Sequence, residues 1–138
     1  STGSPLTPES FEYIYRVLKS DVHLMSISGG TDIVSCFFIS NPIGSVRKGE
    51  LQCAGLAYRM EVFDDEIPEG NEGRALDFDQ QGELVCTMPF PSQPLFFWSD
   101  FDSVNHVANV PALNYHKAYF TRYASCWHHG DRIEAKRS

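Results

Sequence analysis

Residues 24–33 constrain the fold of this chain more than any other stretch. They read Leu-Met-Ser-Ile-Ser-Gly-Gly-Thr-Asp-Ile, with apolar runs on either side that begin at Val22 and at Ile33. We expect a buried strand over residues 22–27 that ends at the two glycines, bringing flexible backbone, a hydroxyl and a carboxylate to one edge of a sheet. In open α/β sheets that edge is where ligands bind, and glycine lets a phosphate approach the backbone closely. From these residues alone, an ordinary strand-ending Gly-Gly turn is the alternative.

Charge and composition exclude two classes of partner. The 138 residues carry a formal net charge of −7, with 42% hydrophobic and 21% charged residues. Nucleic-acid surfaces need clustered Lys and Arg, so we expect no nucleic-acid partner. The apolar runs are far shorter than the roughly 20 residues that span a bilayer, so we expect no membrane partner. Eight acidic residues lie within residues 61–79, so a bound anion would need backbone N–H groups and a metal ion against this charge.

The cysteines and histidines give little support for a zinc site. No Cys-x-x-Cys pair occurs, and His128 and His129 are adjacent, which prevents both rings from facing one metal from a helix. Isolated cysteines in apolar runs are typical of buried free thiols in a reducing compartment. We therefore expect a cytoplasmic protein with unpaired thiols at the four cysteines, Cys36, Cys53, Cys86 and Cys126.

The N-terminal residues predict a loop followed by a helix. Thr7 is a suitable N-cap, although Ser10 competes for that role, and Pro8 suits the first helical position. Apolar residues then recur at the spacing of one helical face: Phe11, Ile14, Tyr15 and Leu18. With the expected strand over 22–27, residues 1–40 read as the end of a βαβ layer whose first strand is missing.

From residue 41 the sequence predicts mainly β-structure. Residues 41–44 form a turn, and we expect short strands over 50–53, 57–63, 82–87 and 95–98, with a short helix over 115–123. The aromatic run 96–98 is either a functional cluster or one wall of a small barrel, and the wall is favoured. We expect an exposed, mobile acidic loop over 64–81 and a second loop over 100–113. The expected fold class is α+β or mixed: an incomplete βαβ layer over 1–40, then a small distorted β-barrel subdomain over 41–138.

Three motifs, in this order and spacing, resemble those of the AMP-forming acyl-CoA synthetases of the adenylate-forming superfamily. The first motif is Ser-Thr-Gly-Ser-Pro-Leu at 1–6, the second is Ser-Ile-Ser-Gly-Gly-Thr-Asp-Ile at 26–33, and the third is His-Gly-Asp at 129–131. Gly-Glu-Leu-Val-Cys-Thr at 82–87, with the prolines at 89 and 91 and Phe97-Trp98, looks like the acetoacetyl-CoA synthetase branch. The fold implied is that of the large N-terminal domain of such enzymes.

The resemblance implies substrates and residue roles. Enzymes of this family join a carboxylate to ATP through an acyl-adenylate and then pass the acyl group to coenzyme A, so ATP, Mg²⁺, coenzyme A and acetoacetate are implied. Fixed donors and a metal stabilise the negative charge in both steps. The adenine would lie against Gly3, Ser4 and Pro5. Adenine, acyl group and phosphates would be lined by Ser26, Ile27, Ser28, Gly29, Gly30 and Thr31.

Three further roles follow from the same resemblance. Asp131 would accept hydrogen bonds from both ribose hydroxyls, and Asp32 would help to hold Mg²⁺. Gly29 would leave room in the acyl pocket for the extra carbons of acetoacetate. One departure stands beside the third motif, because the family places an aromatic residue where this chain has Arg132.

The chain matches only part of such an enzyme. The phosphate-binding loop of the family would precede residue 1, and the catalytic lysine domain would follow residue 138. We therefore expect an internal fragment of an acetoacetyl-CoA synthetase with no complete catalytic set, inactive alone, whose partner is the remainder of the parent chain. The alternative is a truncated, non-catalytic binding or interaction module of the same fold. In that case the apolar helix stripe would support self-association.

Overall fold

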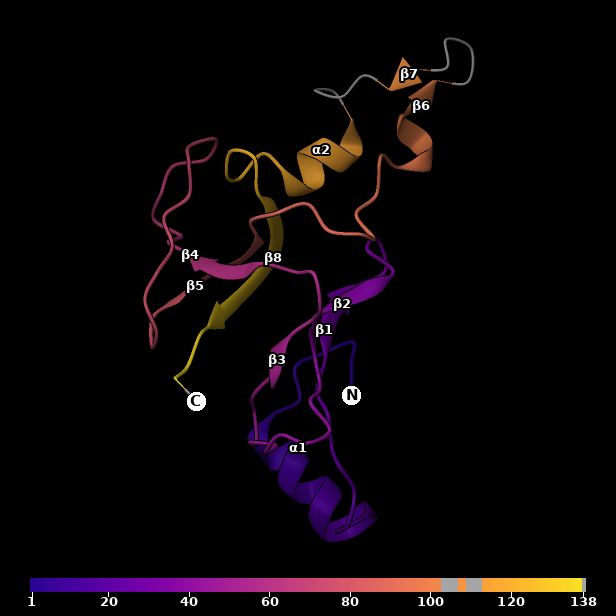
Figure 1. The fold of residues 1–138 in the computed structure, drawn as a ribbon, viewed down its shortest axis with the longest axis vertical. Coiled ribbons are helices and arrows are strands. Elements are labelled where there is room, and N and C mark those ends of the chain that lie inside the picture. The colour runs from indigo at the N-terminus through magenta and orange to yellow at the C-terminus, as the bar shows by residue number, and fades with distance from the viewer. Residues whose placement is uncertain (103–106, 109–112, 138) are drawn as a thin grey trace. The chain divides into compact units, whose positions relative to one another are not determined.

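The computed structural model describes residues 1–102, 107–108 and 113–137 (Figure 1). The chain forms two compact units, Ser1–Ala57 and Tyr58–Ser138, which are described separately below. The expected loop 100–113 lies mostly outside the described residues. The expected subdomain boundary at residue 40 stays a prediction.

The helix of the first unit begins as its sequence predicts. Helix α1 (Pro8–Tyr13) has Thr7 as its N-cap, whose Oγ1 accepts a hydrogen bond from the backbone N–H of Ser10 at 3.3 Å. It continues into a π-helical turn, η1 (Ile14–Leu18), in which the Lys19 N–H donates to the Ile14 carbonyl at 2.9 Å. The N-terminal cap was therefore predictable from local chemistry, whereas the widened last turn was not.

The apolar stripe of this helix is buried at one end only. Phe11 is 2% exposed, whereas Leu18 is 67% exposed. Between them, the Tyr15 hydroxyl accepts a hydrogen bond from the backbone N–H of Leu24 at 3.2 Å. Tyr15, in the middle of the stripe, thus holds the segment around Leu24 against the helix. Leu18, in the last turn of the helix, is exposed to solvent.

The first unit contains a three-stranded antiparallel sheet in the order β1-β2-β3, formed by β1 (Ser28–Gly30), β2 (Ser35–Ile39) and β3 (Cys53–Ala54). The predicted strand over 22–27 is wrong, because regular pairing begins only at Ser28, and the predicted strand over 50–53 is shortened to its end. Ile33 and Phe37, both 0% exposed, are the buried apolar residues of the hairpin. The predicted turn at 41–44 is present, with the Gly44 N–H donating to the Asn41 carbonyl at 3.1 Å.

One pair of backbone hydrogen bonds preserves part of the expected βαβ arrangement. The Ser1 amino group donates to the Met25 carbonyl at 2.6 Å, and the Ile27 N–H donates to the Ser1 carbonyl at 3.0 Å. These bonds run from Ser1 to the residues on either side of Ser26, which is the pattern of neighbouring parallel strands. The helix α1 connects the two segments, as a crossover helix does.

The second unit is built on a three-stranded antiparallel sheet in the order β4-β5-β8, formed by β4 (Met60–Phe63), β5 (Gln81–Cys86) and β8 (Trp127–Glu134). The central strand β5 buries three consecutive residues, Leu84, Val85 and Cys86, as a strand covered on both faces does. Its position agrees with the strand predicted over 82–87.

The rest of the second unit departs from the predicted elements. Residues 95–98 do not form a strand, since a 3₁₀ turn, η2 (Trp98–Asp100), begins there. Two short strands, β6 (Phe101–Asp102) and β7 (Val107–Ala108), pair antiparallel. Helix α2 (Asn114–Tyr119) ends four residues before the predicted helix over 115–123.

Aromatic rings form much of the core of this unit. The Trp127 ring is 2% exposed, and its centroid lies 3.7 Å from that of Tyr119 in a stacked pair and 5.4 Å from that of Phe90. Phe97 contacts Tyr115 edge to face, whereas Trp98 is 92% exposed. The run 96–98 is thus divided between core and surface.

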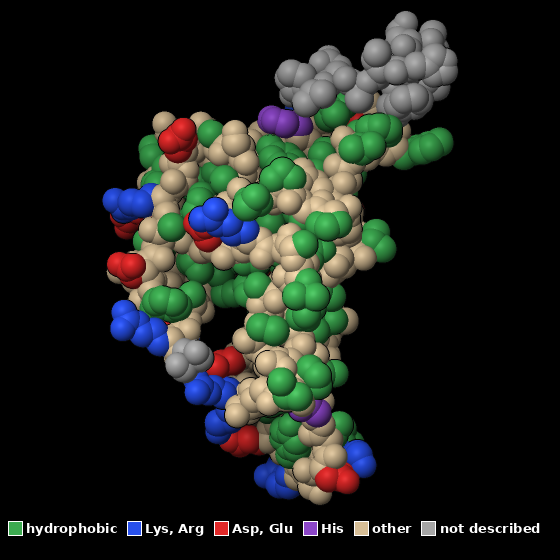
Figure 2. Space-filling view, in the orientation of Figure 1, with side chains coloured by type: hydrophobic (Ala, Val, Ile, Leu, Met, Phe, Trp, Pro, Cys, Tyr) green, Lys and Arg blue, Asp and Glu red, His purple; other side chains and the backbone are tan. Residues whose placement is uncertain are grey.

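The described structure confirms a mixed fold class with few helices and small antiparallel sheets. Hydrophobic side chains reach the surface in several places (Figure 2). In the first unit, Val34, Ile43 and Leu56 are more than four-fifths exposed. In the described ranges, no helix has the length and apolar character needed to cross a membrane.

Candidate functional site

The second motif forms the β1–β2 hairpin. Gly29 and Gly30 lie within β1, and the turn that follows comprises residues 31–34. The Val34 N–H closes this turn on the Thr31 carbonyl at 3.1 Å. Thr31 and Asp32 are exposed at the tip, so a hydroxyl and a carboxylate are presented together, although by a hairpin and not by the end of a buried strand.

One residue of this turn has a strained backbone conformation. Val34 has φ = +49°, a left-handed conformation that β-branched residues rarely adopt. Strain of this kind is common at ligand-binding loops. The turn thus combines exposed oxygen atoms with a conformation that its own sequence does not favour.

The hairpin gives Gly29 a structural reason to be glycine. A Cβ atom built on Gly29 would lie 2.2 Å from the Ser35 carbonyl oxygen and 2.7 Å from the Cys36 Cα. The two strands therefore approach closely at a bulge between Ser28 and Gly29, and glycine inside a strand often marks such an approach. The close approach of the strands therefore requires glycine at position 29 whether or not Gly29 lines an acyl pocket. The acyl-pocket role stays a prediction.

The first motif lies beside the second within the same unit. Ser1 is bonded to the backbone on both sides of Ser26, as described above, and the chain then leaves through Gly3 at φ = +89° with no atom within 4 Å of a built Cβ. Ser4 and Pro5 are exposed. The structure therefore brings together two of the three sequence motifs.

The third motif occupies a bulge in β8. Glu83 of β5 pairs with Arg132, and Val85 pairs with His128, so Leu84 alone spans the same length as His129, Gly130 and Asp131. Gly130 adopts φ = +87°, which glycine does at no steric cost. Bulges redirect side chains and are frequent next to active sites. The side chain of Asp131 is 62% exposed at this bulge.

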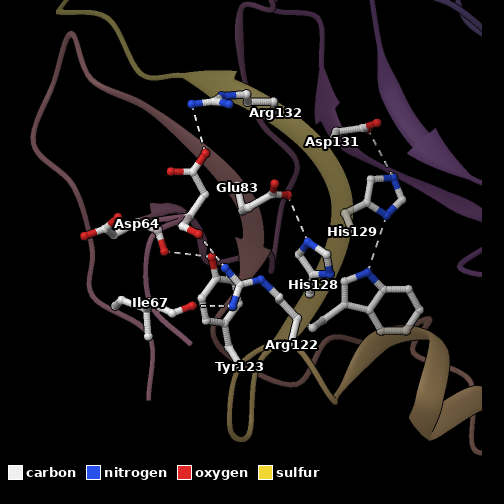
Figure 3. A network of polar contacts seen from close by, with 11 residues as sticks. Asp64, Ile67, Glu83, Arg122, Tyr123, His128, His129, Asp131 and Arg132 are labelled. Atoms are coloured by element: carbon white, nitrogen blue, oxygen red, sulfur yellow. Dashed lines mark hydrogen bonds and ion pairs between the residues drawn. The ribbon is translucent and has the colours of Figure 1, made fainter. Parts of the chain in front are cut away.

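The side chain of His129 lies next to that of Asp131 (Figure 3) and also contacts Trp127. The indole N–H of Trp127 donates to Nδ1 of His129 at 3.4 Å, and Nε2 of His129 lies 3.6 Å from Oδ2 of Asp131. The side chain of His129 is only 11% exposed. A largely buried imidazole thus lies next to the exposed carboxylate of Asp131.

The neighbouring histidine has a different partner. His128 Nε2 lies 2.9 Å from Oε2 of Glu83 on β5, and both side chains are about four-fifths buried. Successive residues of a strand point to opposite faces, so the two rings diverge. Adjacency therefore does not bring both histidines to one metal ion.

The acidic loop is fastened to the segment before β8. The guanidinium of Arg122 donates to the carbonyl oxygens of Ile67 at 2.6 Å and Asp65 at 2.7 Å, and the buried hydroxyl of Tyr123 donates to the Asp64 carbonyl at 2.9 Å (Figure 3). The Gly70 N–H returns a bond to the Arg122 carbonyl at 3.1 Å. The loop is exposed as expected, but its first half is anchored. No local sequence pattern signals these contacts, which join residues more than 50 positions apart.

Asp64 organises the beginning of this loop. Its carboxylate accepts a hydrogen bond from the Glu66 N–H at 2.9 Å and is paired with Arg74. These contacts, the backbone bond first, lower the pKa of Asp64 below its usual value. The next residue, Asp65, pairs with Arg132 of β8 at 2.9 Å, so the loop also contacts the residue that follows Asp131.

The metal and thiol expectations concern other residues. Among the described residues, no group of three or more His, Cys, Asp or Glu side chains is placed to hold a metal ion. A single exposed carboxylate such as Asp32 suits Mg²⁺ that is shared with substrate phosphates, so the chemistry of this residue fits the predicted role. All four cysteines are free thiols. Burial raises the pKa of Cys86 and of Cys126.

The chain is similar in sequence to a segment of several longer proteins. No protein-family model matches the chain. It is 47% identical over 134 residues to the acetoacetyl-coenzyme A synthetase of Rhizobium meliloti and 46% identical over 138 residues to the acetoacetyl-CoA synthetase of Mus musculus. These alignments cover 97% and 99% of the chain but 18% of each relative.

The fold agrees with the sequence. The solved acetoacetyl-CoA synthetase from Streptomyces lividans superposes with a TM-score of 0.71 at 38% identity, over 96% of this chain and 18% of that one. The chain thus spans less than a fifth of the length of the proteins that it matches. In sequence and in fold, the chain therefore matches one segment of the acetoacetyl-CoA synthetases.

Proposed function

We propose that this chain supplies part of the nucleotide and acyl site of an acetoacetyl-CoA synthetase, which uses ATP, acetoacetate and coenzyme A. The observation that carries the proposal is the match to acetoacetyl-CoA synthetases over nearly the whole chain, with 47% identity to the Rhizobium meliloti protein. The three motifs lie within that match, in the order that the family resemblance requires.

The local geometry supports a nucleotide role for the first two motifs. Residues 1–6 and 26–33 are adjacent at Ser1 and Ser26, and Thr31 and Asp32 are exposed at the hairpin tip. In the proposal, Gly3, Ser4 and Pro5 border the adenine. Thr31 donates to a phosphate oxygen, and Asp32 shares Mg²⁺ with the phosphates.

The bulge in β8 supports a ribose role for Asp131. Its carboxylate is exposed, and ionised carboxylates are strong acceptors for hydroxyl donors. In the proposal both oxygens accept from the ribose. Removing the charge then costs a charge-assisted hydrogen bond, about 1.5–3 kcal/mol, which is about a tenfold to hundredfold loss in ATP affinity.

A segment exchange tests the proposal. The matched segment of the Rhizobium meliloti synthetase is replaced by this chain, and acetoacetate-dependent ATP–pyrophosphate exchange is measured. We expect an active chimera in which Asp131→Asn raises KM for ATP and Thr31→Val lowers kcat. Asp77→Asn, in the exposed acidic loop, is the matched control and leaves both constants unchanged. A folded chimera without exchange, or an Asp131→Asn variant equal to the control, contradicts the proposal.

We propose further that the isolated chain does not catalyse the reaction. Effective catalysis needs the reacting groups held together in near-attack geometry, and the chain corresponds to 18% of its relatives. Measurable ATP–pyrophosphate exchange by the 138 residues alone would overturn this part.

The exposed apolar residues of the first unit fit a segment that is covered by the rest of a parent chain. Val17 and Leu18 at the end of the helix, and Val34, Ile43 and Leu56 elsewhere in that unit, are more than half exposed. Exposed patches of this kind mark interaction surfaces. We expect the isolated chain to self-associate in light-scattering measurements and the chimera to have the same mass as the parent synthetase.

A further inference from the structure

The side chain of His129 has no role in the proposal above, although it is close to the carboxylate of Asp131 and largely buried. His129 is 11% exposed, and its Nε2 lies 3.6 Å from Asp131 Oδ2. Contacts of this kind are often long before substrate binds and tighten in the complex. The ring therefore lies where it can hold one oxygen of an exposed carboxylate.

The tautomer of His129 follows from its second contact. The indole nitrogen of Trp127 can only donate, and it donates to Nδ1 of His129 at 3.4 Å. Nδ1 is therefore an acceptor without a proton, and the proton of the neutral ring is on Nε2, which faces Asp131. A second donor partner that fixes the tautomer is typical of histidines that orient other groups.

Trp127 is itself held firmly. It is 2% exposed, and its ring stacks on Tyr119 with an interplanar angle of 14°. Trp127, His129 and Asp131 thus form a series from the aromatic core to the surface at the bulge of Gly130. The core fixes the indole, the indole fixes the imidazole, and the imidazole faces the carboxylate.

We infer that His129 is a positioning residue that orients the Asp131 carboxylate toward the ribose hydroxyls, with its Nε2 proton directed there by Trp127. This inference deepens the proposed function and depends on the ribose role of Asp131. A carboxylate held in one orientation can accept from both hydroxyls at once. A site that binds a substrate hydroxyl discriminates against an analogue that lacks it, so His129 should increase the preference for ATP over 2′-deoxy-ATP.

The first test uses the chimera described above. We expect His129→Phe to raise KM for ATP about fivefold, the usual size for one lost hydrogen bond, with kcat unchanged. It should lower the preference for ATP over 2′-deoxy-ATP by a similar factor. His129→Gln retains an N–H donor of similar reach and should restore most of the preference. Equal losses with both nucleotides, or a loss in kcat alone, would overturn the inference.

Asp131→Asn is measured in parallel so that the two proposals can fail separately. If Asp131→Asn changes the nucleotide preference and His129→Phe does not, the positioning role is wrong and the ribose role stands. If neither variant changes it, the ribose role of Asp131 fails first.

The second test does not depend on activity. Imidazole ¹⁵N chemical shifts of the 138-residue chain, recorded at a pH where His129 is neutral, should show Nε2 protonated and Nδ1 unprotonated. Trp127→Phe keeps an aromatic ring but removes the indole donor, so the two tautomers should become mixed. A protonated Nδ1 in the unsubstituted chain would overturn the inference. Far-ultraviolet circular dichroism establishes that the variant is folded.

Discussion

The anchoring of the acidic loop by Arg122 leads to a quantitative prediction. The guanidinium donates to two carbonyl oxygens, those of Asp65 and Ile67, at 2.7 and 2.6 Å. Hydrogen bonds from charged groups contribute about 1.5–3 kcal/mol each when buried. Since Arg122 is only half-buried, we take about 1 kcal/mol for each bond, below that buried range.

Two substitutions separate charge from geometry at this position. Arg122→Ala should lose both bonds, about 2 kcal/mol, and Arg122→Lys should lose about 1 kcal/mol because an ammonium group cannot span two acceptors as the planar fork does. Arg47→Lys, an exposed arginine in the first unit, is the matched control with no expected change.

Hydrogen exchange measured by mass spectrometry reports how well the backbone amides of the loop are protected. The Gly70 N–H is bonded to the Arg122 carbonyl, and the Ala124 N–H to the Asn71 carbonyl. Local destabilisation of 1–2 kcal/mol should raise exchange at these amides about 5- to 30-fold. If these amides already exchange at the unprotected rate in the unsubstituted chain, or if Arg122→Lys equals the control, the anchoring argument is refuted.

Two other predictions concern stability. Gly29→Ala should lower the free energy of unfolding, measured in urea, because the new Cβ would meet the Ser35 carbonyl oxygen. The expected loss is about 1–3 kcal/mol, the usual cost of forcing extra atoms into a packed site. Unchanged stability would show that the hairpin is more open. The contacts that lower the pKa of Asp64, the Glu66 N–H first, stabilise the fold above the unfolded pKa of about 3.9. This stabilisation is lost as pH falls through the pKa of the folded state. Thermal unfolding should therefore show a fall in Tm on acidification below about pH 4 that is smaller in Asp64→Asn, and equal falls in both proteins would contradict this.

Local chemistry predicted the elements whose causes are local. Thr7 and Pro8 mark the helix start because the cap and the fixed φ act within one turn. Residues 82–87 predicted strand β5 because a short apolar run buried on both faces has a recognisable pattern. The turn at Asn41 follows from its side chain, whose Oδ1 accepts from the Ile43 N–H.

Elements that depend on partners far away in the chain were not predictable in the same way. Residues 22–27 are apolar enough for a strand, but their described pairing is limited to Ser1, and strand formation depends on neighbours more than on propensity. Gly29 signalled flexible backbone, and its cause in the hairpin is a close cross-strand approach. The acidic composition of residues 64–81 indicated a loose loop. Nothing in the sequence of that loop reveals that Arg122 binds two of its carbonyl oxygens.

The candidate site shows the same division. The family resemblance identified Asp131 as a ribose-binding candidate. Only the structure shows the bulge at Gly130 and the contacts that join Trp127, His129 and Asp131. In the sequence, His129 is the first residue of the third motif and one of two adjacent histidines, and neither pattern indicates its contact with Trp127. Its separation from His128 follows from the strand, whose residues alternate between faces.

The central proposal is that residues of all three motifs contact the nucleotide, and an NMR titration with AMP tests it most directly. Backbone amide shifts of the uniformly ¹⁵N-labelled 138-residue chain are followed as AMP is added to high millimolar concentration. The account predicts that the amides of Gly3, Thr31 and Asp131 shift together and fit one weak dissociation constant, with Asp131→Asn weakening all three. Shifts that fit different constants, or that avoid these three residues while others move, would contradict it.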